Sequence, residues 1–371
     1  MRICFYAPFK PLGHPHPSGD RIIASGLYDF LVARGHQVMI ASTLRSRWIY
    51  WKPWLFPAIG KEFFTTSHRI RDFSPDLWLT YHSYYKAPDL LGPLLCHRFN
   101  LPYFIFQGIY SSKQRRSLRG FPGFFLNRWA LLKTKHLFTN RLQDRKNLLR
   151  ILDADRLSYI RPGIFPEHFS ANQEAGLLMR RQWQLGEEPL LLSAAMFRPD
   201  VKTQGLLWMI TALAKLAAQG LPFKLVIAGD GSERETLMRH AQRLLPDRVL
   251  FVGRIERAEM YRFYSAGDLF VFPGIRESLG MVFLEAQSCG LPVVAFDNGG
   301  IPEVVEQGRT ALLAEAFNED AFNAAVQTLL LDPAKRKEMG NAAARHVRRD
   351  HDLDHNYLEF EHILIHHAQT A

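Results

Sequence analysis

The sequence predicts an α/β protein of two doubly wound domains, each built on a parallel sheet. The chain has 371 residues, which is more than one hydrophobic core usually serves. Short apolar runs alternate with segments of helical period along nearly all of it. The alternation is interrupted by the segment 161–169, which contains two prolines, and then starts again. Two domains with a cleft between them follow from this pattern.

The first domain is expected over residues 1–165. An apolar run predicts a strand at 3–7, and apolar residues at helical spacing predict a helix at 21–33 that ends before Gly35. Further apolar runs predict strands at 37–42, 77–81, 103–106, 136–139 and 158–160.

The second domain is expected over residues 185–350, after a linker with a short helix at 171–188. A last helix, 353–371, is expected to pack back on the first domain. Apolar runs in the second domain predict strands at 190–195, 223–228, 249–252, 269–272, 292–296 and 311–313. Segments of helical period between them predict helices at 203–219, 232–244, 257–266, 280–289 and 317–330.

The composition indicates an ordinary globular protein, with 47% hydrophobic and 22% charged residues. It excludes a disordered or collagen-like chain. No run approaches the eighteen apolar residues of a membrane-spanning helix, and near the N-terminus a run of only five apolar residues precedes Pro8, too few for a signal-peptide core. The three cysteines, Cys4, Cys96 and Cys289, lie in apolar stretches, as reduced thiols do. We therefore expect a soluble, cytoplasmic protein.

The positive charge is concentrated in one segment. The formal net charge is +10, and residues 111–150 hold eleven basic side chains against one acid, Asp144. Aromatic residues lie among these cations, and a second aromatic stretch covers 48–56. Cations beside aromatics are typical of a peripheral contact with an anionic membrane surface. Two alternatives stay open: aromatics in the core under a solvated charged face, and a surface on which RNA bases stack.

Two glutamates mark a candidate ligand site. Glu277 follows the strand predicted at 269–272, and Glu285 lies eight residues later, roughly 12 Å along a helix axis. Between them Ser278, Leu279 and Gly280 begin the helix, whose free N–H groups suit a phosphate. One extended ligand would place a sugar hydroxyl on Glu277, a diphosphate on the helix end and a ribose on Glu285.

These residues resemble the Glu-x7-Glu signature of retaining GT-B glycosyltransferases, in particular glycosyltransferase family four. The resemblance implies two Rossmann-like domains that face each other across a cleft, the second of which binds the donor. It also implies an Arg and a Lys after the first strand of that domain, which Arg198 and Lys202 match. With Glu277 they are the expected catalytic residues, because two cations offset the charge of a leaving diphosphate.

The resemblance extends to other positions. Gly19 matches a glycine-rich loop that binds the donor, although Asp20 stands where a second glycine is usual. Arg254 and Ile255 match an edge that binds the nucleotide base. In the first domain, His82 and Gln107 are the candidate acceptor residues, and Gln107 stands where many members have a histidine.

Two Asp-x-Asp motifs imitate the metal site of another glycosyltransferase fold. Asp153-Ala-Asp155 and Asp352-Leu-Asp354 stand beside predicted helices and are interpreted as helix caps. No metal site is expected, and the chain should need no cofactor beyond its donor, a UDP or GDP sugar.

The predicted function is a metal-independent hexosyltransferase that acts with retention in cell-envelope polysaccharide or lipopolysaccharide synthesis. Its acceptor would be a glycan or a lipid-linked glycan, and its place the cytoplasm or the cytoplasmic face of the membrane. The alternatives are a nucleotide-sugar epimerase on the same fold and a non-catalytic RNA-binding or scaffold module. No specific nucleic-acid partner is expected.

Overall fold

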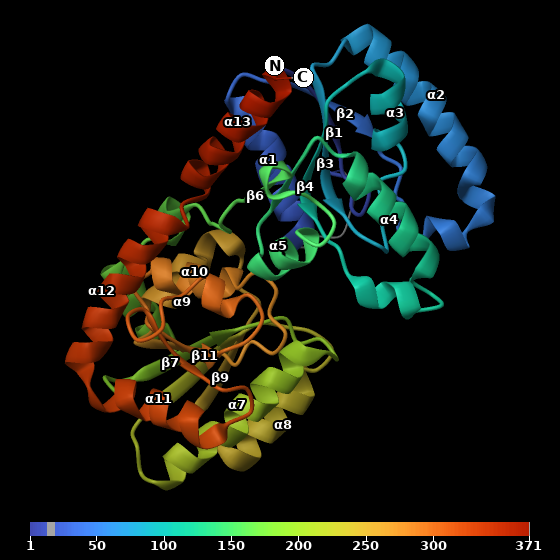
Figure 1. Ribbon diagram of the computed structural model, residues 1–371. Coiled ribbons are helices and arrows are strands. Elements are labelled where there is room, and N and C mark those ends of the chain that lie inside the picture. The colour runs from blue at the N-terminus through green and yellow to red at the C-terminus, as the bar shows by residue number, and fades with distance from the viewer. Residues whose placement is uncertain (13–18, 371) are drawn as a thin grey trace. The chain divides into compact units, whose positions relative to one another are not determined.

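The computed structural model describes residues 1–12 and 19–370, which form two compact units (Figure 1). The first unit joins Met1–Arg161 to the segment from Asp354 onward, and the second is continuous over Pro162–Leu353. Each unit contains a six-stranded sheet in which the strand pairings are parallel. The predicted α/β class is confirmed.

The sheet of the first unit has the strand order β2-β1-β3-β4-β5-β6. Its strands are β1 (Arg2–Tyr6), β2 (Gln37–Ser42), β3 (Leu77–Ser83), β4 (Tyr103–Gly108), β5 (His136–Thr139) and β6 (Leu157–Tyr159). Its described α-helices are α1 (Gly19–Ala33), α2 (Phe56–Phe73), α3 (Gly92–Phe99), α4 (Phe121–Lys133), α5 (Leu142–Leu148) and most of α13 (Leu353–Gln369). Short 3₁₀ helices are η1 (Ile49–Trp51), η2 (Pro53–Leu55), η3 (Ser112–Arg116) and η4 (Ala154–Arg156).

The sheet of the second unit has the strand order β12-β11-β10-β7-β8-β9. Its strands are β7 (Leu190–Ala194), β8 (Lys224–Ala228), β9 (Val249–Gly253), β10 (Leu269–Val271), β11 (Val293–Phe296) and β12 (Ala311–Ala314). Its α-helices are α6 (Gln173–Gln182), α7 (Val201–Ala218), α8 (Arg234–Leu244), α9 (Met260–Ser265), α10 (Met281–Ser288), α11 (Glu319–Leu331) and α12 (Pro333–Asp350). The 3₁₀ helices are η5 (Pro166–Phe169), η6 (Arg257–Glu259) and η7 (Ile301–Glu303).

Helices α2 and α12 are the main elements that the apolar pattern did not predict. The fully buried positions of α2 are Thr66, Ser67 and Ile70, and the partly buried Ile59, Phe63 and Phe73 pack against the same core. Helix α12 buries mainly small or polar residues, among them Gly340, Ala343 and His346. Helix α12 therefore lacks a wide stripe of large apolar side chains at helical spacing.

Helix α13 completes the first unit from the far end of the sequence, and it lies beside α1 in Figure 1. Phe360 packs edge-to-face on Phe106 and Phe138, with ring centroids 5.1 and 4.7 Å apart. The buried carboxylate of Glu361 accepts a 2.9 Å bond from Arg34 Nε and lies 2.7 Å from His36 Nε2. Aromatic packing and a buried ion pair thus fix this helix on the sheet.

His136 should make the first unit less stable in acid. It is buried at the start of β5, where its Nε2 lies 2.9 Å from Ser158 Oγ and its ring stacks on His367. Burial, reinforced by His367, lowers the pKa of His136 to about 4. As pH falls from ~7.5 to ~5, this histidine takes up a proton in the unfolded chain but stays neutral in the folded unit. The free energy of unfolding of the first unit therefore falls by about 2 kcal/mol.

Native-state hydrogen exchange of the β5 amides measures that loss in the first unit alone. The variant His136→Gln keeps a side chain that can bond to Ser158 but does not titrate, so its opening free energy should change less over the same pH range. Equal pH dependence in the two proteins would contradict the assignment.

No helix within residues 1–12 and 19–370 combines the length and the apolar character needed to cross a membrane. Cys4, Cys96 and Cys289 are buried as free thiols.

Candidate functional site

The loop from β10 to α10 carries Glu277 at the carboxyl end of the second sheet. Its carboxylate forms an ion pair with Lys202 Nζ and accepts a 3.2 Å bond from the N–H of Ser278. Lys202 is the second residue of α7, which follows β7, and its ammonium also lies 5.5 Å from the centroid of the Phe272 ring. Because β7 and β10 are neighbours in the sheet, these two loops meet. The structure thus joins two of the three predicted catalytic residues.

Arg198 lies in the loop between β7 and α7, and its guanidinium is exposed apart from a 3.0 Å contact with Met196 Sδ. The backbone of this loop is held by Phe197, whose N–H donates to Asp230 O and whose carbonyl accepts from Glu233. The guanidinium of Arg198 can therefore bind an anion, while the backbone that carries it is held in place.

The turn Gly229-Asp230-Gly231 holds that loop in place. A Cβ at Gly229 would lie 1.9 Å from Ala195 O, and one at Gly231 would lie 2.3 Å from Phe197 O. Both glycines have positive φ, at 145° and 151°. The structure therefore places this turn against the loop that carries Arg198.

Glu285 lies within α10 and is only 8% exposed. Its two oxygens have different partners: Oε2 accepts a 3.0 Å bond from Tyr264, and Oε1 pairs with Arg257 Nη1 at 3.0 Å. Burial raises the pKa of Glu285, and the charge of Arg257 and the bond from Tyr264 partly offset that rise. Neither partner was predicted, since both precede Glu285 by more than twenty residues at no characteristic spacing.

A second unpredicted feature is the turn Asn298-Gly299-Gly300, which follows β11 and packs against the Glu277 loop. Gly300 donates its N–H to Glu277 O at 3.0 Å, and Asn298 Oδ1 accepts from the N–H of Arg276 at 3.1 Å. A Cβ at Gly299 would lie 2.2 Å from Glu277 O, and one at Gly300 would lie 2.0 Å from Ser278 O. The detectable signal was the Asn-Gly-Gly cluster after a predicted strand.

The other residues predicted to bind the sugar donor lie at the start of α10, after β9 and, for Gly19, in the first unit. Ser278 is exposed, Leu279 is partly buried, and Gly280 is the buried N-cap of α10 with φ 67°. Arg254 pairs with Glu256, and Ile255 packs on the core of the second unit. These two follow β9, whereas Lys202 follows β7 and Glu277 follows β10.

Gly19 begins α1 in the first unit, and Pro17 and Ser18 of its motif lie outside the described residues.

His82 and Gln107 occupy matching places in the first unit, near the carboxyl ends of β3 and β4. Both strands run two residues beyond the predicted ends, so both residues lie within strands. Both are buried and have left-handed backbone, with φ of 61° and 66°. The ring of His82 stacks on Tyr84 at 4.8 Å. Non-glycine residues rarely adopt this conformation, and such strain concentrates at functional sites.

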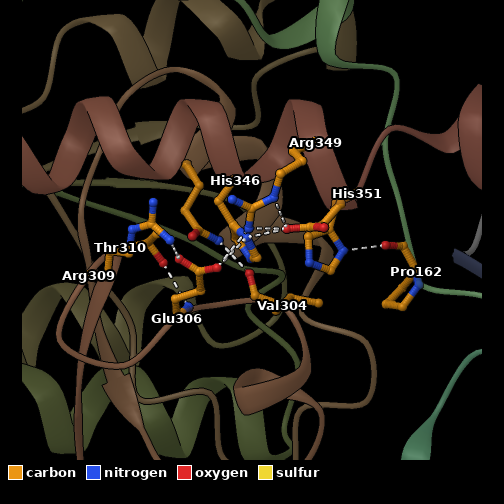
Figure 2. Close-up of polar contacts among 10 residues, drawn as sticks. Pro162, Val304, Glu306, Arg309, Thr310, His346, Arg349 and His351 are labelled. Atoms are coloured by element: carbon orange, nitrogen blue, oxygen red, sulfur yellow. Dashed lines mark hydrogen bonds and ion pairs between the residues drawn. The ribbon is translucent and has the colours of Figure 1, made fainter.

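Figure 2 shows a polar cluster in the second unit that the sequence spacing did not predict. His346 Nδ1 lies 3.4 Å from Glu306 and 3.1 Å from Asp350, and the three ligand-type atoms lie within 4.8 Å of one another. Arg309 and Arg349 each pair with Glu306 at 3.0 and 2.9 Å. The carboxylates are thus neutralised by guanidinium groups, and the cluster fixes α12 to the loop before β12.

Asp153 was one of the residues interpreted as a helix cap. Asp153 occupies the N-cap position of η4, but its side chain makes no capping hydrogen bond. The interpretation of this residue as a cap was therefore wrong in its chemistry.

Comparison with known proteins finds a family model that matches part of the second unit. Residues 178–346 match the family described as glycosyl transferases group 1. Over this segment, 169 of the 371 residues, the chain is similar to that family. The recognised resemblance is therefore confirmed, and the matched segment contains Arg198, Lys202, Glu277 and Glu285.

Curated relatives match this chain in part. A GDP-mannose-dependent alpha-(1-6)-phosphatidylinositol monomannoside mannosyltransferase of Mycolicibacterium smegmatis is 35% identical over 202 residues, 52% of each protein. Alpha-D-kanosaminyltransferase of Streptomyces kanamyceticus is 31% identical over 212 residues, 56% of this chain and 54% of the relative. The chain spans about half the length of the curated relatives it matches.

Solved structures match nearly the whole chain in fold. Sucrose-phosphate synthase from Thermosynechococcus elongatus covers 100% of both chains with a TM-score of 0.77 and 20% identity. Anabaena HepE in complex with UDP covers 98% of this chain and 99% of its own, with a TM-score of 0.76 and 18% identity. At these identities the likeness shows the fold alone, and it confirms the predicted GT-B class.

Proposed function

We propose that this chain is a retaining glycosyltransferase that moves a sugar from a UDP or GDP sugar to a glycan or lipid-linked glycan of the cell envelope. The observation that carries the proposal is the Lys202–Glu277 pair beside the exposed guanidinium of Arg198, at the carboxyl ends of adjacent strands. Ligands of doubly wound sheets bind at such ends. The GDP-mannose-dependent relative and the neighbour bound to UDP support a nucleotide-sugar donor.

The chemistry required of these residues is electrostatic. As the bond between sugar and diphosphate breaks, negative charge grows on the leaving group, and the cations of Arg198 and Lys202 would stabilise it. The leaving diphosphate then takes the proton of the acceptor hydroxyl, so no nucleophile from the protein is needed. Glu277, oriented by Lys202 and by the N–H of Ser278, would hold a hydroxyl of the transferred sugar.

A thermal-shift screen over nucleotide-diphosphate sugars tests the donor site, since a ligand that binds only the folded protein raises its melting temperature. Product analysis with a labelled donor then separates a transferase from an epimerase. A chain that binds RNA but no nucleotide sugar would be the non-catalytic module instead. EDTA should leave the transfer rate unchanged, because the proposed charge stabilisation comes from arginine and lysine.

Glu285 is expected to act on nucleotide affinity more than on turnover. We propose that it accepts hydrogen bonds from the ribose, and Glu285→Gln should weaken binding of the nucleoside diphosphate by about 1–3 kcal/mol. The amide retains an oxygen for Tyr264, which keeps that buried bond. Isothermal titration calorimetry measures the change, with the exposed Glu259→Gln as the control. If the variant bound the nucleoside diphosphate as tightly as the unmodified protein, the proposed contact between Glu285 and the ribose would be contradicted.

The segment 111–150 is proposed to bring the enzyme to the cytoplasmic face of an anionic membrane. Its eleven basic residues against one acid supply the attraction, at roughly 1 kcal/mol for each cation near such a surface. This contact would place the enzyme beside a lipid-linked acceptor.

A further inference from the structure

Two segments far apart in the sequence, residues 48–54 and residues 118–119, meet on the surface of the first unit. The second segment leads into the N-terminal end of α4, which is labelled in Figure 1. The indole N–H of Trp51 donates to Arg119 O at 2.9 Å, and the guanidinium of Arg119 lies 4.6 Å from the centroid of a Trp48 ring. Between the segments lies an open hollow of about 540 Å³, lined by Trp48, Trp51, Lys52, Trp54, Leu118 and Arg119. We call it the tryptophan hollow.

The rim of the tryptophan hollow is unusually apolar for a surface. Leu118 is 92% exposed and Trp54 is 70% exposed. Phe56, Phe121 and Phe125 nearby in the sequence are each about half exposed. These side chains are therefore not part of the core, which was one of the interpretations left open by the sequence. Apolar residues clustered on a surface mark a place of interaction.

Cations accompany these apolar groups. Lys52 and Arg119 line the hollow, and Lys113, Arg115 and Arg116 lie on η3, just before Leu118. Tryptophan at the boundary between water and lipid, with basic residues beside it, is typical of proteins that dock on acidic bilayers. Nucleic-acid bases and sugar rings stack on flat aromatic faces, and a protruding leucine offers none. The observations thus favour a lipid.

We propose that the tryptophan hollow receives one acidic phospholipid, with its upper acyl segment against Trp54 and Leu118 and its phosphate beside Lys52 and Arg119. This inference rests on the proposed membrane contact of residues 111–150 and narrows it to a defined site. Binding to the membrane then has two contributions, electrostatic attraction and insertion of apolar side chains. Attraction of the scattered cations is screened by salt, whereas insertion of Trp54 and Leu118 is not.

Flotation with vesicles of phosphatidylcholine, with and without phosphatidylglycerol, tests the proposal. The unmodified protein should float only with the acidic vesicles and should retain part of its binding in ~0.5 M salt. Trp54→Ala with Leu118→Ser should lower its partition by about 10- to 100-fold and abolish the part that resists salt. The control is Leu178→Ser with Leu331→Ser in the second unit, whose side chains are 56% and 65% exposed.

The outcomes separate the site from the broader membrane proposal. If the double variant at Trp54 and Leu118 floats as well as the control, the hollow is not the lipid site, while the membrane contact stands. If the unmodified protein floats with neither vesicle, the membrane contact itself fails. Displacement from acidic vesicles by RNA, together with RNA binding that is lost in Trp54→Ala, would make the hollow a nucleic-acid surface. A blue shift of tryptophan fluorescence on acidic vesicles, absent in the double variant, would support insertion.

Discussion

Replacing Lys202 by alanine should lower the rate of sugar transfer by about 10²- to 10³-fold with donor at saturation, the cost of removing one group that stabilises charge in the transition state. The change also leaves Glu277 without its ion-pair partner. Arg198→Ala should have an effect of similar size. Among the described residues its exposed guanidinium makes one polar contact, with Met196, so folding should be unaffected.

Helix α7 offers a matched control. Lys215 is 58% exposed on the same helix and pairs with Glu319, so Lys215→Ala removes an equal charge away from the proposed site. Turnover near that of the unmodified protein in Lys202→Ala would remove this lysine from the mechanism. Combining Lys202→Ala with Glu277→Gln provides a double-mutant cycle, in which the two losses should not add because the residues act as a pair.

Gly299→Ala is expected to reduce transfer by about 10²-fold while the protein stays folded. The added Cβ would lie 2.2 Å from Glu277 O and would therefore push the Glu277 loop away from Lys202. A displacement of about 1 Å in a group that positions substrate is enough for such a loss. Steady-state kinetics with the donor identified by thermal shift measures it.

Gly308→Ala separates displacement from backbone strain. Gly308 also has a positive φ, 77°, but a Cβ there meets nothing within 4 Å. Both alanines carry the cost of left-handed backbone, about 1–2 kcal/mol, and Gly299→Ala should lose further thermal stability because its Cβ also meets the backbone of Glu277. Only Gly299→Ala should lose activity, and equal activity in the two variants would contradict a role for the Asn298-Gly299-Gly300 turn in placing Glu277.

Much of the fold could be predicted because the inner strands of both sheets are buried on two faces. Such strands are continuous apolar runs, and β5 has the bounds that the sequence predicted, as has the partly exposed edge strand β2. The pattern failed where burial involves small or polar side chains, as in α12. It also ended β3 and β4 too early, because their last residues include the polar His82 and Gln107.

The site could be predicted only where a residue's position directly after a predicted strand determines its place in the fold. Lys202 and Glu277 follow strands that a doubly wound sheet brings together at one edge. The partners of Glu285 and the turn beneath Glu277 come from elsewhere in the chain, and only the packed structure brings Tyr264, Arg257 and Gly299 to them. Long-range contacts of this kind leave no spacing in the sequence.

The position of α13 has a consequence for synthesis on the ribosome. The second unit is one continuous stretch, so it can finish folding as it emerges, whereas the first unit must wait for a helix that is translated after the whole second unit. Until then the nascent first unit lacks Phe360 between Phe106 and Phe138, and His36 lacks the carboxylate of Glu361. During that interval the first unit exposes Phe106 and Phe138, and we expect it to be more prone to aggregation than the finished unit.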